Sequence, residues 1–422
     1  MKKQESTTYD AIVIGGGPAG MMAATRAAGL GAHVLLLEKN EKPGKKLLIT
    51  GGGRCNVTNA ELDDRKLLEK FKGKGKFLFS AFSQFSVADT LEFFHSRGMP
   101  TIIEEGQRVF PKSERAQSVW NVLEGEMKKK RVTIYTNSPC SGFVSKDGKI
   151  TGVKLSNGDV LRARSYILAT GGMSRPETGS TGEGFIWLEK IGHTVTKPNP
   201  ALVPIRTKEA WSHKLSGLAF SNAKVSIFQN GALQDARAGK ILFTHVGLSG
   251  PLILNMSKDI GELLKYGNVA LAIDLFPKED QGTLDKHIQE IFRLHQNKKL
   301  KNVLGEITEK ALAQAMPMHL KLSEDEEVNK ITKEERLRIV KFLKAIPITP
   351  TGILGVDKAV VTSGGVILEE IDFKTMRSRI HENLYLVGDV LDIDRPSGGY
   401  SLQLCWTTGF VAGTHIAQEI KH

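Results

Sequence analysis

The chain has 422 residues, of which 40% are hydrophobic and 25% charged, and it carries a net charge of +12. This is the composition of a globular protein of one to three domains, and no apolar run reaches the roughly 18–20 residues that a membrane-spanning helix needs. The N-terminus "MKKQESTTYD" lacks the apolar core of a secretory signal, and three widely spaced cysteines exclude a disulfide framework and zinc-binding spacing, so we expect a cytoplasmic protein without a metal site.

The first predicted elements are a strand, a glycine turn and a helix. Residues 10–14 are apolar and β-branched, as in a buried parallel strand, and residues 21–28 are small and suit a helix. Between them Gly15, Gly17 and Gly20 have the spacing G-x-G-x-x-G. In such a motif the first glycine makes the tight turn, the second lets the backbone approach a pyrophosphate, and the third lets helix and strand pack closely. The positive end of the helix dipole favours a diphosphate at the same place.

An acidic residue ends the second predicted strand, residues 32–38. A carboxylate at Glu38 can accept hydrogen bonds from ribose hydroxyls, and it disfavours a cofactor with a 2′-phosphate. Strand, turn, helix, strand and acid therefore occur in the order of a dinucleotide-binding unit. FAD and NAD share the ADP half that this unit binds, so the motif alone leaves both open.

A second glycine-rich stretch, "PGKKLLITGGGRCNVTN" (43–59), follows directly. Its triple glycine beside Arg54 is typical of a backbone loop that lies along a dinucleotide, or of a glycine-rich hairpin. We expect Cys55 in this stretch to be a small packing residue. Dithiol exchange needs two sulfurs within reach, and Cys140, the nearest other cysteine in the sequence, is remote. A flavin disulfide reductase is therefore not expected.

Two later strands end in motifs of their own. The strand "RSYILATGG" (164–172) ends in Ala-Thr-Gly, and "ENLYLVGDVLD" (382–392) ends in Gly-Asp before a long apolar helix that starts near Gly398. With the N-terminal glycine motif, these resemble the three fingerprints of FAD-binding proteins related to glutathione reductase. The resemblance implies that Asp389 bonds the ribityl chain and that the last helix points its N-terminus at the isoalloxazine, where it would stabilise the reduced flavin anion.

Four longer stretches narrow the resemblance. These are "GKKLLITGGGRCNVTN", "GKILFTHVGLSGPLIL" (239–254), "AVVTSGGV" (359–366) and "GDVLDIDRPSGGYSLQ" (388–403). They are similar to the BaiN/YhiN-type bacterial flavoproteins, also called aminoacetone oxidase family FAD-binding enzymes or NAD(P)/FAD-dependent oxidoreductases. The late motif departs from the family pattern at Asp389 and over residues 392–397, which bears on the substrate pocket rather than on FAD.

The resemblance covers nearly the whole chain and implies a fold, a cofactor and a set of contacts. The fold class is α/β: a Rossmann-like, glutathione-reductase-type FAD-binding domain with an inserted small β domain and a helical segment. The residues expected at FAD are Gly15, Gly17, Pro18, Ala19, Gly20, Glu38, Lys39, Lys46, Gly52, Gly53, Arg54, Cys55, Asn56, Thr170, Gly171, Gly388, Asp389, Gly399, Ser401 and Leu402.

Pattern changes along the chain predict its domain organisation. Residues 131–172 alternate around Asp-Gly and Asn-Gly turns as a series of hairpins, and prolines at 198, 200 and 204 mark a boundary. We expect four segments, described by residue range: 1–192 as the first part of the FAD-binding domain, 193–280 as an inserted β-rich domain, 281–345 as an inserted helical segment, and 346–422 as the second part of the FAD-binding domain.

Three residues are weak candidates for catalysis. His245, in a glycine-rich loop, suits a general acid or base, although a structural histidine bonded to backbone is the more common case. Tyr400, at the start of the last helix, could donate to a substrate carbonyl or simply pack. Arg54 could face the flavin edge, an anionic substrate or a phosphate. No second G-x-G-x-x-G occurs, so NAD(P)H is expected only as a transient co-substrate.

Lysine and arginine cluster at residues 65–77, 128–131 and 298–301. Such runs are typical of solvated helix faces, and they also suit a phosphate-rich partner. Three functions follow. The first is an FAD-dependent oxidoreductase that passes hydride between flavin and a small organic substrate, with NAD(P)H as a candidate donor. The alternatives are an RNA-associated, RNA-modifying flavoprotein and a flavin redox sensor without turnover. The oligomeric state is open.

Overall fold

The computed structural model describes residues 9–355 and 357–421, and they form two compact units. The first unit runs to Pro200 and resumes at Ala359, and the second is Ala201–Lys358. The sequence-based segments divide instead after residues 192, 280 and 345. The first unit extends beyond 192 because β11 (Val195–Ala201) pairs with β19 (Val361–Val366) in a two-stranded sheet.

A seven-stranded sheet forms the centre of the first unit, in the order β20-β21-β22-β10-β1-β2-β6. Strands β22, β10, β1, β2 and β6 are parallel, and β20 and β21 complete the edge in antiparallel pairing. The apolar residues of β1, β2 and β22 are buried on both faces, as in doubly wound sheets, whereas Tyr135 of the edge strand β6 is exposed. The bounds are β1 Tyr9–Ile14, β2 Val34–Leu37, β6 Thr133–Tyr135, β10 Ala163–Leu168, β20 Ile371–Asp372, β21 Arg377–Ser378 and β22 Leu384–Leu386.

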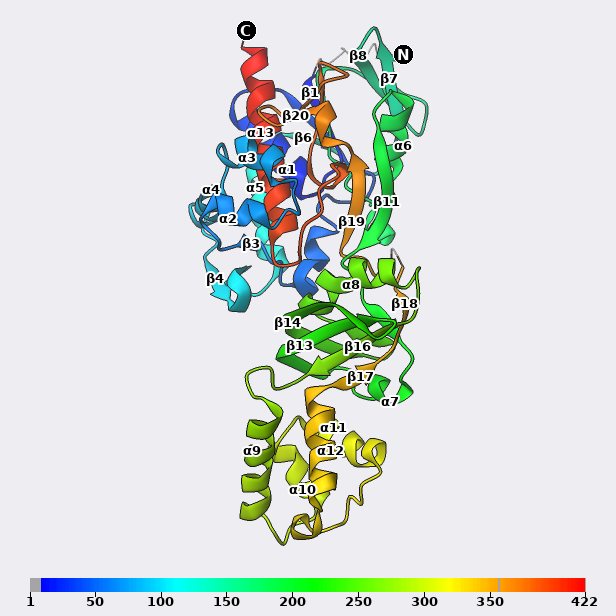
Figure 1. Ribbon diagram of the computed structural model, residues 1–422. Helices are drawn as coiled ribbons and strands as arrows, with labels where there is room; N and C mark the ends of the chain where they lie inside the picture. The colour runs from blue at the N-terminus through cyan, green and yellow to red at the C-terminus, as the bar shows by residue number, and fades with distance from the viewer. Residues whose placement is uncertain (1–8, 356, 422) are drawn as a thin grey trace. The chain divides into compact units, whose positions relative to one another are not determined.

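Helices and two small sheets surround this central sheet (Figure 1). The helices are α1 Pro18–Gly29, α2 Asp64–Glu69, α3 Gly75–Phe82, α4 Val87–His95, α5 Ala116–Lys129, α6 Glu183–Lys190 and α13 Tyr400–Ile420. The small antiparallel sheets are β3 Thr58–Asn59, β4 Thr101–Glu104 and β5 Arg108–Pro111, and β7 Cys140–Lys146, β8 Lys149–Leu155 and β9 Val160–Leu161.

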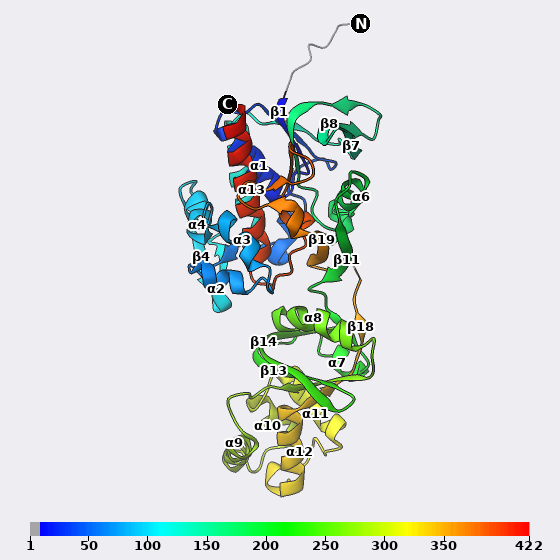
Figure 2. The same cartoon turned by 45° about the horizontal axis from the view of Figure 1, so that its top comes forward.

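The first and last helices of this unit pack directly on each other. Figures 1 and 2 both show α13 lying beside α1. A side chain on Gly409 would overlap the backbone oxygen of Ala19, and one on Gly413 would meet that of Ala23. Small residues therefore let the two backbones approach closely, and this contact joins the two ends of the chain in one core.

The second unit has its own antiparallel sheet and its own core. The strand order is β17-β16-β13-β14-β15-β12-β18, and β13 and β14 form a hairpin at Asn230-Gly231, where both residues have positive φ. The bounds are β12 Ile205–Thr207, β13 Ala219–Gln229, β14 Ala232–Thr244, β15 Gly247–Ser249, β16 Val269–Asp274, β17 Ile346–Ile348, β18 Pro350–Ile353, α7 Ala210–His213, α8 Pro251–Leu263, α9 Gln281–Leu294, α10 Leu300–Val303, α11 Lys310–Leu320 and α12 Lys333–Lys344. Among the residues that the structure describes, no helix combines the length and apolarity needed to cross a membrane.

Candidate functional site

One cavity in the first unit is lined by residues from most of the sequence motifs. It has about 1150 Å³ of empty space, including its opening to solvent. Of the residues expected at the cofactor, those that line it are Gly15, Gly17, Pro18, Ala19, Glu38, Lys39, Lys46, Thr170, Gly171, Asp389, Ser401 and Leu402.

The N-terminal glycine motif forms one end of the cavity. Gly17 is the N-cap of α1, and a Cβ added there would meet nothing within 4 Å. A Cβ on Gly20 would overlap the backbone oxygen of Gly15. The two glycines therefore serve different purposes: Gly20 permits the packing of turn and helix, whereas Gly17 leaves open space at the helix N-terminus. First-turn N–H groups have no acceptor inside the helix and suit an anion.

Glu38 lies at the same end, at 7% exposure. Its Oε2 accepts a hydrogen bond from Gly16 N at 2.8 Å, and its Oε1 accepts from Asn40 N at 2.8 Å and from Asn40 Nδ2 at 2.7 Å. The carboxylate thus fixes the glycine turn and the loop after β2. Because two carboxylate oxygens offer about four acceptor positions, capacity remains for ribose hydroxyls.

We expect Glu38→Ala to weaken FAD binding by about 1–3 kcal/mol, because hydrogen bonds to ribose and the hold on the glycine turn are both lost. Titration of the purified apoprotein with FAD, followed by flavin fluorescence, measures the change. Glu41→Ala is the matched control, because Glu41 is a nearby exposed carboxylate that does not line the cavity. Equal affinities of the two variants would contradict the role given to Glu38.

One of the lining residues, Asp389, belongs to a buried ion pair. Asp389 follows β22, and its carboxylate pairs with the guanidinium of Arg395, whose side chain is 1% exposed. Arg395 Nε also donates to Ser401 Oγ at 3.0 Å, in the first turn of α13. Sequence reasoning missed Arg395. The available signal was a lone basic residue in the short link between the Gly-Asp motif and the last helix.

Lys46 and Thr170 add polar groups to the wall. Lys46 Nζ donates to Ser174 Oγ at 2.6 Å, and burial lowers the pKa of its ammonium group, against a smaller opposing effect of Asp389. The buried hydroxyl of Thr170 has no hydrogen-bond partner among the described residues. A buried hydroxyl that lines a cavity without a partner is a ready contact for a ligand.

The cavity cysteines are not redox-active thiolates. Cys140 and Cys405 line the wall, and burial raises the pKa of each thiol to about 12. Burial likewise raises the pKa of Cys55 to about 12. A thiol with such a pKa is protonated at neutral pH and is a poor nucleophile.

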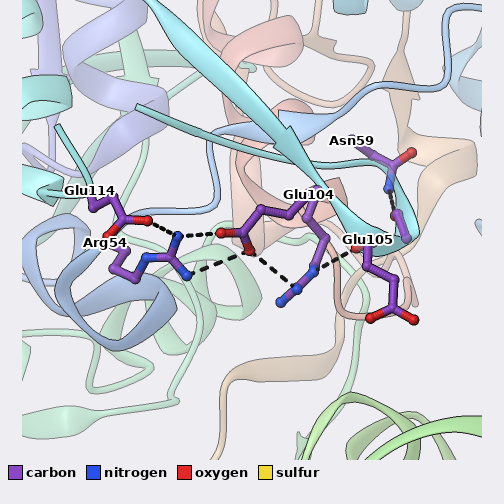
Figure 3. Close-up of polar contacts among 7 residues, drawn as sticks. Arg54, Asn59, Glu104, Glu105 and Glu114 are labelled. Atoms are coloured by element: carbon purple, nitrogen blue, oxygen red, sulfur yellow. Dashed lines mark hydrogen bonds and ion pairs between the residues drawn. The ribbon is translucent and has the colours of Figure 1, made fainter. Parts of the chain in front are cut away.

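Several residues expected at the cofactor do not line this cavity. Arg54 is one of them: its guanidinium lies between Glu104 and Glu114 (Figure 3). The guanidinium also lies over the ring of Phe110, 4.2 Å from the centroid. The hydrogen bond to Glu104 is the largest effect raising the pKa of Arg54. With both carboxylates engaged, this arginine anchors the glycine turn 51–53 and is not free to bind a substrate anion. The others outside the lining are Gly20, Gly52, Gly53, Cys55, Asn56, Gly388 and Gly399.

The remaining catalytic candidates also lie apart from the cavity wall. Tyr400 is 8% exposed and packs edge-on against Phe71, with ring centroids 6.0 Å apart, and burial raises its pKa. His245 belongs to the second unit, exposed in the turn between β14 and β15. Neither residue gains a catalytic role from these surroundings.

The residues present fit FAD. Open space at Gly17 and an acid at Glu38 suit the ADP half, whereas Thr170, the Asp389–Arg395 pair and the α13 N-terminus suit the polar flavin half. A family model described as "HI0933-like protein Rossmann domain" matches residues 9–415. The chain belongs to the HI0933-like family. The resemblance drawn from the motifs is thereby confirmed.

Three curated relatives that this HI0933-like chain matches over nearly its whole length are bacterial. It is 31% identical to the 3-dehydro-bile acid delta(4,6)-reductase of Clostridium scindens, covering 96% of this chain and 98% of that protein. It is 30% identical to the ribosomal RNA dihydrouridine synthase of Escherichia coli, covering 97% and 98%. The family and these relatives support the coarser functional prediction, an FAD-dependent oxidoreductase.

Solved structures show the same fold at low identity. A 3-ketosteroid delta1-dehydrogenase from Sterolibacterium denitrificans matches with a TM-score of 0.56 at 16% identity, covering 98% of this chain and all (100%) of that one. A flavocytochrome c3 fumarate reductase matches with a TM-score of 0.55 at 16% identity, covering 98% and 78%. The predicted fold class, an α/β Rossmann-type FAD-binding domain, is confirmed.

Proposed function

We propose that this protein is an FAD-dependent reductase of carbon–carbon double bonds conjugated to a carbonyl group. The observation that carries the proposal is the cavity itself, which joins a dinucleotide-binding turn at Glu38 to a buried polar end at Asp389 and α13. Such a cavity suits the whole length of FAD and leaves the reacting end among a few charged groups.

Two relatives support the choice of reaction. One is named a bile acid delta(4,6)-reductase, and the other a dihydrouridine synthase. A 3-oxo steroid with double bonds at C4 and C6 is a conjugated ketone, and the C5–C6 bond of uracil is conjugated to the C4 carbonyl. Both substrates therefore accept hydride at an electrophilic carbon of the conjugated system, the β carbon in uracil and the β or δ carbon in the dienone, and then a proton on the resulting enolate. A small conjugated ketone is the simplest substrate of this kind.

When bound, FAD supplies the hydride for this reaction. The chain's own residues would bind and orient it: Glu38 and the α1 N-terminus the ADP half, Thr170 and Asp389 the central polar groups. Ser401 stands in the first turn of α13, where the helix dipole favours negative charge on a reduced flavin. No proton donor is assigned within the cavity.

The test is anaerobic reduction followed by reoxidation. Holoprotein is reduced with NADH or NADPH, and the flavin absorbance is followed after addition of 2-cyclohexen-1-one, with cyclohexene as the unconjugated control. We expect one of the two nicotinamides to reduce the flavin, and the enone but not the alkene to reoxidise it with formation of cyclohexanone. A reduced flavin that both compounds leave unchanged and only oxygen reoxidises would contradict the proposal, and one that neither nicotinamide reduces would favour a sensor.

A second candidate substrate is a uracil base within RNA. The observation that favours it is the net charge of +12, together with a group of exposed lysines in the first unit. A polyanion is attracted to such a surface, whereas a small neutral ketone gains nothing from it. The reaction at the flavin is the same for both substrates.

A further inference from the structure

Residues 70–79, "KFKGKGKFLF", form a basic loop that leads from α2 into α3, and we call it the lysine loop. From residue 70 to residue 88 the sequence has four lysines and no acidic residue. Lys70, Lys72 and Lys76 are exposed, and Phe79 is 52% exposed. Lys76 and Phe79 are three positions apart on α3 and so share one face of the helix.

Among the described residues, three of the four lysines in the lysine loop lack an acidic partner, whereas every lysine of the run 298–301 and two of the four basic residues of the run 128–131 have one. Lys128 and Lys129 pair with Glu124 and Glu126 on their own helix. In the run 298–301, all three lysines pair with Glu306 or Asp325. Within the described part of the chain, Lys70, Lys72 and Lys76 form no ion pair, and their charge is therefore available to a partner.

The fourth lysine, Lys74, connects the loop to the segment that follows the cavity residue Asp389. Lys74 Nζ pairs with Asp392 Oδ2 at 2.7 Å and donates to the Asp392 carbonyl at 2.6 Å. Asp392 lies in the short link between Asp389 and Arg395, the buried pair of the cavity wall. The free lysines thus stand on a segment that is fixed directly to the candidate active site, within the same unit.

A second contact fixes the loop to α13. Phe71 packs edge-on against Tyr400, the first residue of that helix, and the next two residues, Ser401 and Leu402, line the cavity. Phe77 also packs against Phe373, with ring centroids 6.0 Å apart. Three anchors inside the loop leave its lysines and Phe79 outward, as in surfaces that bind single-stranded nucleic acid through phosphates and stacked bases.

We propose that the lysine loop binds the sugar–phosphate backbone of single-stranded RNA, with Phe79 stacking on a base, and so brings a neighbouring uracil to the cavity. This inference rests on the proposed reductase function, of which it names the substrate class. Lysines recognise the phosphates without sequence preference, whereas the cavity would select the base that is reduced.

The test compares two triple variants of the FAD-loaded protein. Lys70→Gln/Lys72→Gln/Lys76→Gln removes the free charges, and Lys298→Gln/Lys299→Gln/Lys301→Gln removes three paired lysines with the same change in net charge. Binding of a fluorescein-labelled 20-nucleotide oligouridine RNA is measured by anisotropy at several salt concentrations. For single strands each lost phosphate contact lowers the slope of log K against log salt by about 0.7, so we expect a loss of about 2 in the first variant only. Phe79→Ala, at unchanged charge, should weaken binding by about 5- to 150-fold, equivalent to a stacking contribution of about 1–3 kcal/mol.

The possible outcomes distinguish RNA binding by the lysine loop from the reductase function on which this inference rests. Bound FAD is measured in every variant to show that it is folded. Equal slopes of the two triple variants, or no binding of the RNA by the unaltered protein, would overturn the lysine loop as an RNA surface while leaving enone reduction in place. RNA binding that depends on the loop, in a protein whose reduced flavin is reoxidised neither by an enone nor by the oligouridine RNA, would uphold the surface and refute the reductase.

Discussion

Gly17→Val is expected to give a folded protein that contains no FAD. A side chain at this position meets no protein atom within 4 Å, and the backbone of Gly17, with φ −76° and ψ −179°, is open to valine. The valine would instead fill the space next to the α1 N-terminus, where a pyrophosphate would lie. Overpacking and lost charge-assisted hydrogen bonds together cost about 3 kcal/mol or more, which is about 100-fold or more in affinity.

The measurement is the FAD content of the purified variant and its affinity on reconstitution, with circular dichroism to show that it is folded. Gly20→Val is the informative partner, because its side chain would overlap the Gly15 backbone and should prevent folding altogether. A yellow Gly17→Val protein with native affinity would refute the assignment of this turn to the pyrophosphate.

Asp389→Ala is expected to lower the free energy of unfolding by about 3–5 kcal/mol, because it leaves the buried guanidinium of Arg395 without a counter-charge. Replacement of both partners removes this penalty. The double variant Asp389→Ala/Arg395→Met should therefore recover most of the lost stability in urea unfolding of the apoprotein.

The single and double variants also allow the effect on stability to be measured separately from the effect on cofactor binding. If Asp389 also bonds FAD, the stable double variant still binds the cofactor more weakly than the unaltered protein does. Two results would contradict this account: an Asp389→Ala protein as stable as the original, or a double variant no more stable than the single one.

The dinucleotide-binding half of the fold could be predicted from the sequence because its elements are close together along the chain. Strand, glycine turn, helix and Glu38 all fall within residues 9–38, and each has a steric or electrostatic requirement that a few residue types satisfy. The hairpin at Asn230-Gly231 was likewise predictable, because its turn needs two residues with positive φ.

Side-chain partners across distant segments were not predictable in the same way. The positive charge of Arg54 suits the binding of an anionic substrate. In the structure, however, Arg54 forms ion pairs with Glu104 and Glu114, which lie well beyond it in the sequence (Figure 3). Arg395 lies between two glycine motifs and gives no periodic signal, although it is the buried partner of Asp389. The contacts of both arginines depend on tertiary packing, which a single sequence does not encode as a pattern.

The joining of α1 to α13, and of β10 to β22, places the two ends of the polypeptide in one core, whereas residues 201–358 form a contiguous unit. On the ribosome this middle unit emerges whole before the final helix has been synthesised, and domains generally fold as they emerge. The flavin-binding unit cannot be completed until α13, Tyr400–Ile420, has left the ribosome. A nascent chain stalled before this helix emerges would therefore contain a folded middle unit but an incomplete site for the flavin.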